Sequence, residues 1–158
     1  MEKTNVMRIL EQKNIPYTAH TYPHEEGVAV DGVTVAQAMG QDPECVFKTL
    51  VARGASKAVY VFAIPVADNL DLKKAARAAG EKSIEMVHVK EINALTGYIR
   101  GGCSPVGMKK AYPTFFHETA EIVDRIAVSA GKIGFQVELD PADLLALTGG
   151  ALADLTVA

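Results

Sequence analysis

Two apolar runs joined by a short polar link constrain the fold more than any other feature of this sequence. Residues 45–52 and 58–66 both have the length of strands, and the second run is apolar at nearly every position, as in a strand covered on both faces. Residues 53–57 between them have the composition of a turn. The pattern predicts an antiparallel hairpin whose second strand lies in the centre of a sheet.

The order of the remaining elements distinguishes between sheet architectures. We expect helices at residues 5–13, 33–39, 72–79, 89–95 and 141–147, and further strands at 17–22, 83–87, 114–117, 122–129, 133–139 and 153–157. Strands follow one another directly in several places, without the regular alternation that a doubly wound sheet requires. The sequence therefore predicts one compact domain, residues 1–158, of mixed α/β class with a largely antiparallel sheet. In the third helix, Leu72 is expected to face the body of the domain.

The composition argues against several classes of protein. No stretch approaches the about 18 consecutive apolar residues of a membrane span, and the first residues lack the apolar core of a signal peptide, so we expect a cytoplasmic protein without membrane contact. The net charge of −3 argues against tight, autonomous binding of nucleic acid, which usually needs a basic protein. The two cysteines are widely spaced, which makes a disulfide framework or a zinc site improbable.

A glycine-rich loop is the first candidate for a functional site. Residues 97–107 contain four glycines and one proline. Such a loop can direct several backbone N–H groups at one oxygen-rich group, either a phosphate or a developing oxyanion. The same composition also occurs in ordinary turns between regular elements, so the loop alone leaves both interpretations open.

Lys48 is the second candidate, because alternation along its strand places it on the same face as Val46 and Leu50. A lysine among aliphatic side chains loses hydration of its charge unless a partner or a ligand compensates for it. It could hold a negative group or stabilise an oxyanion. Equally, it could lie on an edge strand with its aliphatic stem over apolar surface.

The histidines and cysteines suggest metal or nucleophilic chemistry only weakly. His20 and His24 lie close together, but no third ligand is spaced for a metal site, so structural or surface roles are favoured and we expect neither metal nor cofactor. Cys103 lies in the glycine-rich loop and could act as a nucleophile. A small buried cysteine is the commoner case.

Basic side chains cluster in two places. Usually such runs are solvated faces, although the second cluster directly follows the glycine-rich loop and could meet phosphates there. The candidates for contact with a phosphate-bearing ligand are Lys73, Lys74, Arg77, Lys109 and Lys110.

Several stretches, taken together, resemble the YbaK / prolyl-tRNA synthetase editing-domain family. These are residues 47–50 (FKTL), 72–76 (LKKAA), 97–107 (GYIRGGCSPVG) and 128–134 (VSAGKIG), and the segment 20–22 (HTY) resembles the free-standing YbaK branch. The similarity runs nearly from end to end. The order and spacing of the four motifs make it specific, whereas any one of them would be weak.

The resemblance implies a free-standing aminoacyl-tRNA deacylase with a curved, partly barrel-like sheet flanked by helices. Its branch is implied to remove cysteine from Cys-tRNA(Pro), with the substrate's own thiol attacking the ester, and to act beside prolyl-tRNA synthetase. Cysteine and proline are similar in size, so a binding pocket separates them poorly and a second, hydrolytic sieve is needed. Cys-tRNA(Cys) as a further substrate, an Ala-tRNA(Pro) deacylase of the sister branch, and a non-catalytic module that binds aminoacyl-tRNA or the synthetase remain alternatives.

The resemblance also implies roles for individual residues. The family lysine corresponds to Lys48, and the family GxxxP loop corresponds to residues 101–105, with Cys103 a loop residue and not the catalyst. The implied catalytic groups are Lys48, Gly101 and Gly102, and the implied substrate-binding residues are Tyr22, Val30, Thr49, Cys103, Ser104, Pro105 and Ser129.

Overall fold

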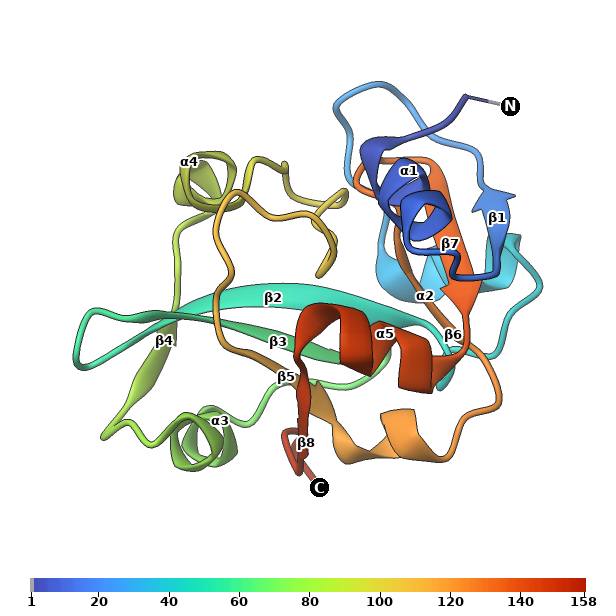
Figure 1. Ribbon diagram of the computed structural model, residues 1–158. Coiled ribbons are helices and arrows are strands. Elements are labelled where there is room, and N and C mark those ends of the chain that lie inside the picture. The colour runs from blue at the N-terminus through green and yellow to red at the C-terminus, as the bar shows by residue number, and fades with distance from the viewer. Residues whose placement is uncertain (1) are drawn as a thin grey trace.

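The hairpin predicted from the two apolar runs is the centre of the computed structural model, which describes residues 2–158 (Figure 1). β2 (Phe47–Gly54) pairs antiparallel with β3 (Val59–Pro65). Four consecutive residues in the middle of β3 are completely buried, because side chains pack against both faces of this strand. The prediction of a central apolar strand is therefore confirmed.

Two sheets are built around this hairpin. The larger has the order β4-β2-β3-β5-β8, where β4 is Ile84–Met86, β5 is Thr114–His117 and β8 is Ala151–Ala153. Only its β3–β5 and β5–β8 pairs are parallel. The smaller sheet is antiparallel and has the order β1-β7-β6, where β1 is Tyr17–Thr21, β7 is Phe135–Leu139 and β6 is Ile126–Ser129. A backbone bridge between Val46 and Ala127 joins the two.

This arrangement confirms the mixed, largely antiparallel α/β class and corrects one detail. The partly closed single sheet expected from the family resemblance is an open pair of sheets, because a bridge and not a full ladder connects β2 to β6.

Short helices cover the sheets and connect their strands. They are α1 (Asn5–Gln12), α2 (Gly32–Ala38), α3 (Leu72–Ala79), α4 (Ile92–Thr96) and α5 (Pro141–Thr148), with 3₁₀ turns at Val89–Glu91 and Glu118–Glu121. α3 packs on one face of the larger sheet through Ala75 and Ala76. The glycine-rich loop lies on the other face, where Cys103 packs against Val51 (Figure 1). None of the helices in the described part of the chain is long and apolar enough to cross a membrane.

Three local expectations were wrong. The strand expected at 122–129 begins only at Ile126, because a 3₁₀ turn precedes it and leaves Ile122 exposed. The last strand is Ala151–Ala153 and not 153–157, because these earlier residues pair with β5. Leu72 is exposed, since it is the first residue of α3 and lies beyond the turn that packs on the sheet.

Replacing Asp71 with alanine is expected to lower the free energy of unfolding by about 1 kcal/mol. The Asp71 carboxylate caps α3 by accepting hydrogen bonds from the N–H groups of Lys73 at 3.0 Å and Lys74 at 3.1 Å. Urea denaturation measures the change. Asp124→Ala is the control, because Asp124 is exposed and caps no helix; equal loss in both variants would contradict a specific capping effect.

Candidate active site

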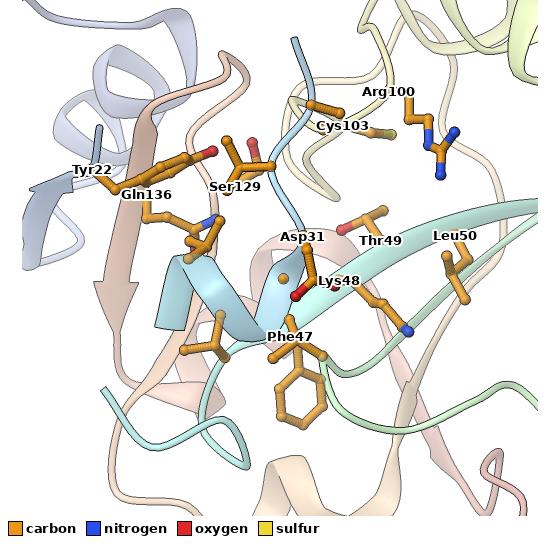
Figure 2. A pocket seen from close by; sticks show the side chains of 17 residues that line it. Tyr22, Asp31, Phe47, Lys48, Thr49, Leu50, Arg100, Cys103, Ser129 and Gln136 are labelled. Carbon is orange, nitrogen blue, oxygen red and sulfur yellow. The ribbon is translucent and has the colours of Figure 1, made fainter. Parts of the chain in front are cut away.

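A pocket of about 470 Å³ opens between the two sheets (Figure 2). The start of β2 forms one wall, and the ends of β6 and β7 form the opposite wall. The segment that leads into α2 and the glycine-rich loop complete it. The lining residues are Tyr22, Ala29, Val30, Asp31, Gly32, Val35, Val46, Phe47, Lys48, Thr49, Leu50, Val66, Arg100, Gly101, Cys103, Ser129 and Gln136.

The pocket brings together most of the residues that the sequence singled out, although they come from five separate segments. Those that line it are Tyr22, Val30, Lys48, Thr49, Gly101, Cys103 and Ser129. The other three, Gly102, Ser104 and Pro105, are buried and do not line it. Ser104 is fully enclosed, and its hydroxyl oxygen accepts the N–H of Val106 at 3.2 Å. Its position indicates a role in shaping the loop.

Lys48 reaches the pocket because β2 has an unpaired edge at that point. β4 pairs only with the far end of β2, from Ala52 to Gly54, and so leaves the edge at Lys48 open. The side chain is partly buried and forms no ion pair within the part of the chain that the structure describes. Burial lowers the pKa of Lys48, although the carboxylates of Asp31 and Asp68 act in the opposite direction. The result is a partly desolvated cation available to an anionic ligand.

Lys48 is expected to release its proton at a lower pH than an ordinary lysine. Its pKa lies below the usual value of 10.5 because burial disfavours the charged form. As pH rises, the ammonium is therefore lost earlier, and any function that needs its charge declines earlier. Titration of the side-chain Cε signal by NMR, assigned by its loss in Lys48→Ala, measures the midpoint. A midpoint at or above 10.5 would contradict the expectation.

The glycine-rich loop depends on Gly101 and Gly102 for close approach of backbones. Gly101 has φ +87°, and a Cβ there would lie 2.9 Å from the Cβ of Ala29. A Cβ on Gly102 would lie 3.1 Å from the backbone nitrogen of Ile133. The hydroxyl of Tyr98 donates a hydrogen bond to the Val106 carbonyl and closes the loop. Side chains at either glycine would therefore displace the loop from the pocket.

One backbone N–H group of this loop forms a hydrogen bond within the fold, and two others are available to a ligand in the pocket. The N–H of Gly102 donates to the Ile99 carbonyl at 2.9 Å and forms a turn. Gly101 and Cys103 line the pocket, and their N–H groups donate to no acceptor within residues 2–158. These two groups are the ones that can serve an oxyanion.

Cys103 lines the pocket but is poorly suited to be a nucleophile. The residue is 8% exposed, and burial raises the pKa of its thiol to about 11. The thiol therefore stays protonated at neutral pH, whereas the thiolate is the nucleophilic form.

The Cys103 thiol is expected to resist alkylation. Iodoacetamide labelling of the native protein at pH 8 should proceed much more slowly at Cys103 than in the same protein unfolded in guanidinium, with peptide mass spectrometry separating it from Cys45. The reason is the raised pKa of about 11 together with burial. Labelling of native Cys103 as fast as in the unfolded chain would contradict this environment.

The two basic clusters lie on different faces of the molecule. Lys109 and Lys110 are exposed just after the glycine-rich loop, on the pocket side of the larger sheet. Lys73, Lys74 and Arg77 lie on α3, across that sheet (Figure 1). The Lys74 ammonium is already engaged, because it donates to the Asp154 carboxylate and, at 2.8 Å, to the Thr156 carbonyl. Lys109 and Lys110 therefore share a face of the larger sheet with the pocket, but none of the five basic residues lines it.

The histidines considered as metal ligands already have protein partners and do not line the pocket. His20 Nε2 lies 2.9 Å from a carboxylate oxygen of Glu138, and His24 Nδ1 lies 3.0 Å from the Tyr22 carbonyl oxygen. His117 gathers with two exposed carboxylates, but its Nδ1 already accepts the N–H of Leu155 at 3.1 Å.

Three polar residues of the pocket were not recognised in the sequence. Asp31 caps α2 by accepting the N–H of Thr34. The residues just before α2 show no helix or strand pattern in the sequence, so nothing singled it out. Arg100 lies within the glycine-rich loop, where its position beside Gly101 was the available signal. Gln136 lies on β7, where alternation places it on the face opposite the buried Val137 and Leu139, so the sequence pattern indicated an outward orientation and gave no signal for the pocket.

Comparison with known proteins agrees with this site. The family described as the aminoacyl-tRNA editing domain matches residues 27–147, a range that contains nearly all of the pocket. The chain belongs to this family. Editing domains act on aminoacyl-tRNA, so the enzyme class expected from the sequence resemblance is confirmed.

Individual relatives cover nearly the whole chain. A protein of Enterococcus faecalis with the name Cys-tRNA(Pro)/Cys-tRNA(Cys) deacylase EbsC is 46% identical over 155 residues, which cover 98% of this chain and 94% of that protein. A crystal structure described as a trans-editing enzyme for prolyl tRNA synthetase is 26% identical, with a TM-score of 0.83 and full coverage of both chains. A further crystal structure, of a hypothetical protein, shares the fold at 20% identity, with a TM-score of 0.84 and coverage of 96% of this chain and 99% of that one.

Proposed function

We propose that this editing-domain protein removes cysteine from mischarged Cys-tRNA(Pro). The observation that carries the proposal is the pocket itself. Lys48 lines it together with Gly101 and Cys103, and within residues 2–158 the Lys48 ammonium has no ion pair and the N–H groups of the other two have no acceptor. The 46% identical relative named for cysteinyl-tRNA deacylation supports this choice of substrate, and Cys-tRNA(Cys) is included as a second substrate. The whole of residues 1–158 acts as one deacylase domain in the cytoplasm, where tRNA is charged.

The proposed division of labour follows from charge. Lys48 binds the terminal phosphate or ribose of the acceptor end, because a partly buried cation without an ion pair favours an anionic ligand. The N–H groups of Gly101 and Cys103 hold the ester carbonyl and stabilise the negative charge that develops on its oxygen. Gly102 acts indirectly, because its N–H group already closes the turn with Ile99.

In the proposed reaction the substrate supplies its own nucleophile. The cysteinyl sulfur forms a bond to the ester carbon, the bond from that carbon to the tRNA ribose oxygen breaks, and the thiol proton ends on that oxygen. The products are free tRNA and a cyclic thiolactone of cysteine. A thiol is intrinsically nucleophilic, and intramolecular placement can lower the barrier by about 7–11 kcal/mol. Alanine and proline are spared because they have no thiol.

The net charge of −3 indicates that this protein needs a partner protein to bind tRNA. Tight binding of the tRNA body normally requires a basic surface, and none of the exposed basic residues Lys73, Lys109 and Lys110 lines the pocket. We therefore infer that prolyl-tRNA synthetase delivers the mischarged tRNA to this protein.

The deciding experiment is deacylation at sub-stoichiometric protein, with Cys-tRNA(Pro), Ala-tRNA(Pro) and Pro-tRNA(Pro) in parallel. We expect multiple turnovers of the cysteinyl ester, with thiolactone or its hydrolysis product released and the other two esters spared. Cleavage of the alanyl ester instead would contradict thiol-assisted chemistry and identify water as the nucleophile. Protection of all three esters, with and without added synthetase, would contradict deacylase activity and favour a non-catalytic module that binds aminoacyl-tRNA.

A further inference from the structure

The two ends of the pocket differ in charge. Lys48, Arg100 and the carboxylate of Asp31 lie towards one end (Figure 2). The other end holds the uncharged side chains of Tyr22, Ser129 and Gln136 (Figure 2), and burial raises the pKa of the Tyr22 hydroxyl, which keeps it neutral. A ligand with one anionic end and one neutral end would therefore bind in a single direction.

Gln136 is the unusual member of the neutral end. The residue is 6% exposed, yet its Oε1 is buried without a hydrogen-bond partner. No acceptor within residues 2–158 receives its amide N–H group, which faces the pocket in Figure 2. The fold therefore leaves the hydrogen-bonding groups of this carboxamide unused within residues 2–158, and its N–H group is available to a ligand in the pocket.

The neighbours of Gln136 show why the fold does not satisfy it. Ser129 is its direct cross-strand partner on β6, where side chains on one face lie in contact range. The Ser129 hydroxyl oxygen, however, accepts the N–H of Gly131 at 3.1 Å. Ser129 therefore stays at the strand end and does not bond to the Gln136 carboxamide.

We propose that the amide N–H group of Gln136 donates a hydrogen bond to the sulfur of the cysteinyl side chain and thereby determines specificity for cysteine. The assignment rests on the proposed function, which places the phosphate end of the substrate at Lys48. The amino-acid side chain then lies at the opposite, uncharged end, with Tyr22, Ser129 and Gln136 (Figure 2). A neutral amide donor at this uncharged end suits a thiol and stabilises the thiolate as it forms.

The experiment compares Gln136→Met, which keeps the side chain's length and removes its donor, with Gln136→Glu, which replaces the donor by a carboxylate. Gln37→Met and Gln37→Glu are the matched controls, because Gln37 is exposed on α2 and outside the pocket. Circular dichroism and thermal melting verify folding of each variant. The readouts are kcat/KM for Cys-tRNA(Pro) and the inhibition constant of 2-aminobutyryl-tRNA(Pro), in which a methyl group replaces the thiol.

We expect Gln136→Met to lower kcat/KM for the cysteinyl ester about tenfold and to leave the inhibition constant of the 2-aminobutyryl ester within about twofold. Gln136→Glu should lose more activity, because its carboxylate repels the forming thiolate, and it decides the question if the Met variant does not fold. Wild-type kcat/KM in the folded Gln136 variants, or equal weakening of both ligands, overturns the assignment alone. Wild-type protein that cleaves no ester overturns the proposed function, and this assignment with it.

Discussion

Lys48→Ala should lower kcat/KM for Cys-tRNA(Pro) by about 10²-fold or more while the protein remains folded. Without the cation that holds the terminal phosphate or ribose, the ester is misplaced relative to the N–H groups of Gly101 and Cys103, and a displacement of about 1 Å can cost about 10²-fold in rate. Little stability should be lost, because Lys48 forms no ion pair in the described chain and its burial disfavours its own charge. Lys48→Ala is therefore expected to lower the activity and to leave the free energy of unfolding nearly unchanged.

Two further substitutions at Lys48 separate charge from shape. Lys48→Met keeps the length of the side chain and should be as inactive as alanine. Lys48→Arg retains the cation and should recover part of the activity, although its planar group has a different reach. Lys13→Ala is the control, because Lys13 is exposed just after α1 and outside the pocket. Activity of Lys48→Ala close to that of the wild type, measured by single-turnover deacylation, would remove Lys48 from the site.

The strand order was predictable only as far as local patterns determine it. Residues 58–66 indicated the central strand because a continuous apolar run of this length is typical of a strand buried on both faces, and the adjacent run indicated the hairpin. The parallel pairing of β3 with β5 and of β5 with β8 was not predictable in this way. It joins segments far apart in sequence, and their patterns contain no information about partner or direction.

The candidate site was predictable where residue chemistry was unusual for its position. Lys48 interrupts an apolar strand, and residues 97–107 concentrate glycine, so both stand out in the sequence alone. Arg100 gave a weaker signal and Gln136 gave none, because a polar residue in a strand or loop is ordinary until its surroundings are known. That Ser104 is enclosed and that Gly102 closes a turn also depends on three-dimensional contacts.

Gly101→Ala is the second substitution expected to have a large effect. Gly101 has φ +87°, and an added Cβ would approach the Cβ of Ala29 to 2.9 Å and its Cα to 3.1 Å. Ala29 belongs to the segment that leads into α2 and also lines the pocket, so the loop or that segment has to move. A displacement of about 1 Å can lower the rate about 10²-fold, and we expect a loss of that size in kcat/KM.

Gly40→Ala separates the cost of backbone strain from the cost of displacing the loop. Gly40 has φ +67°, and an added Cβ there meets nothing within 4 Å. Both variants should lose about 1–2 kcal/mol of unfolding free energy from the left-handed backbone, with a further loss from crowding in Gly101→Ala. Only Gly101→Ala should lose deacylase activity at temperatures where both are folded. Full activity in Gly101→Ala, or equal inactivation of both variants, would show that the close approach of this loop to Ala29 does not determine the geometry for catalysis.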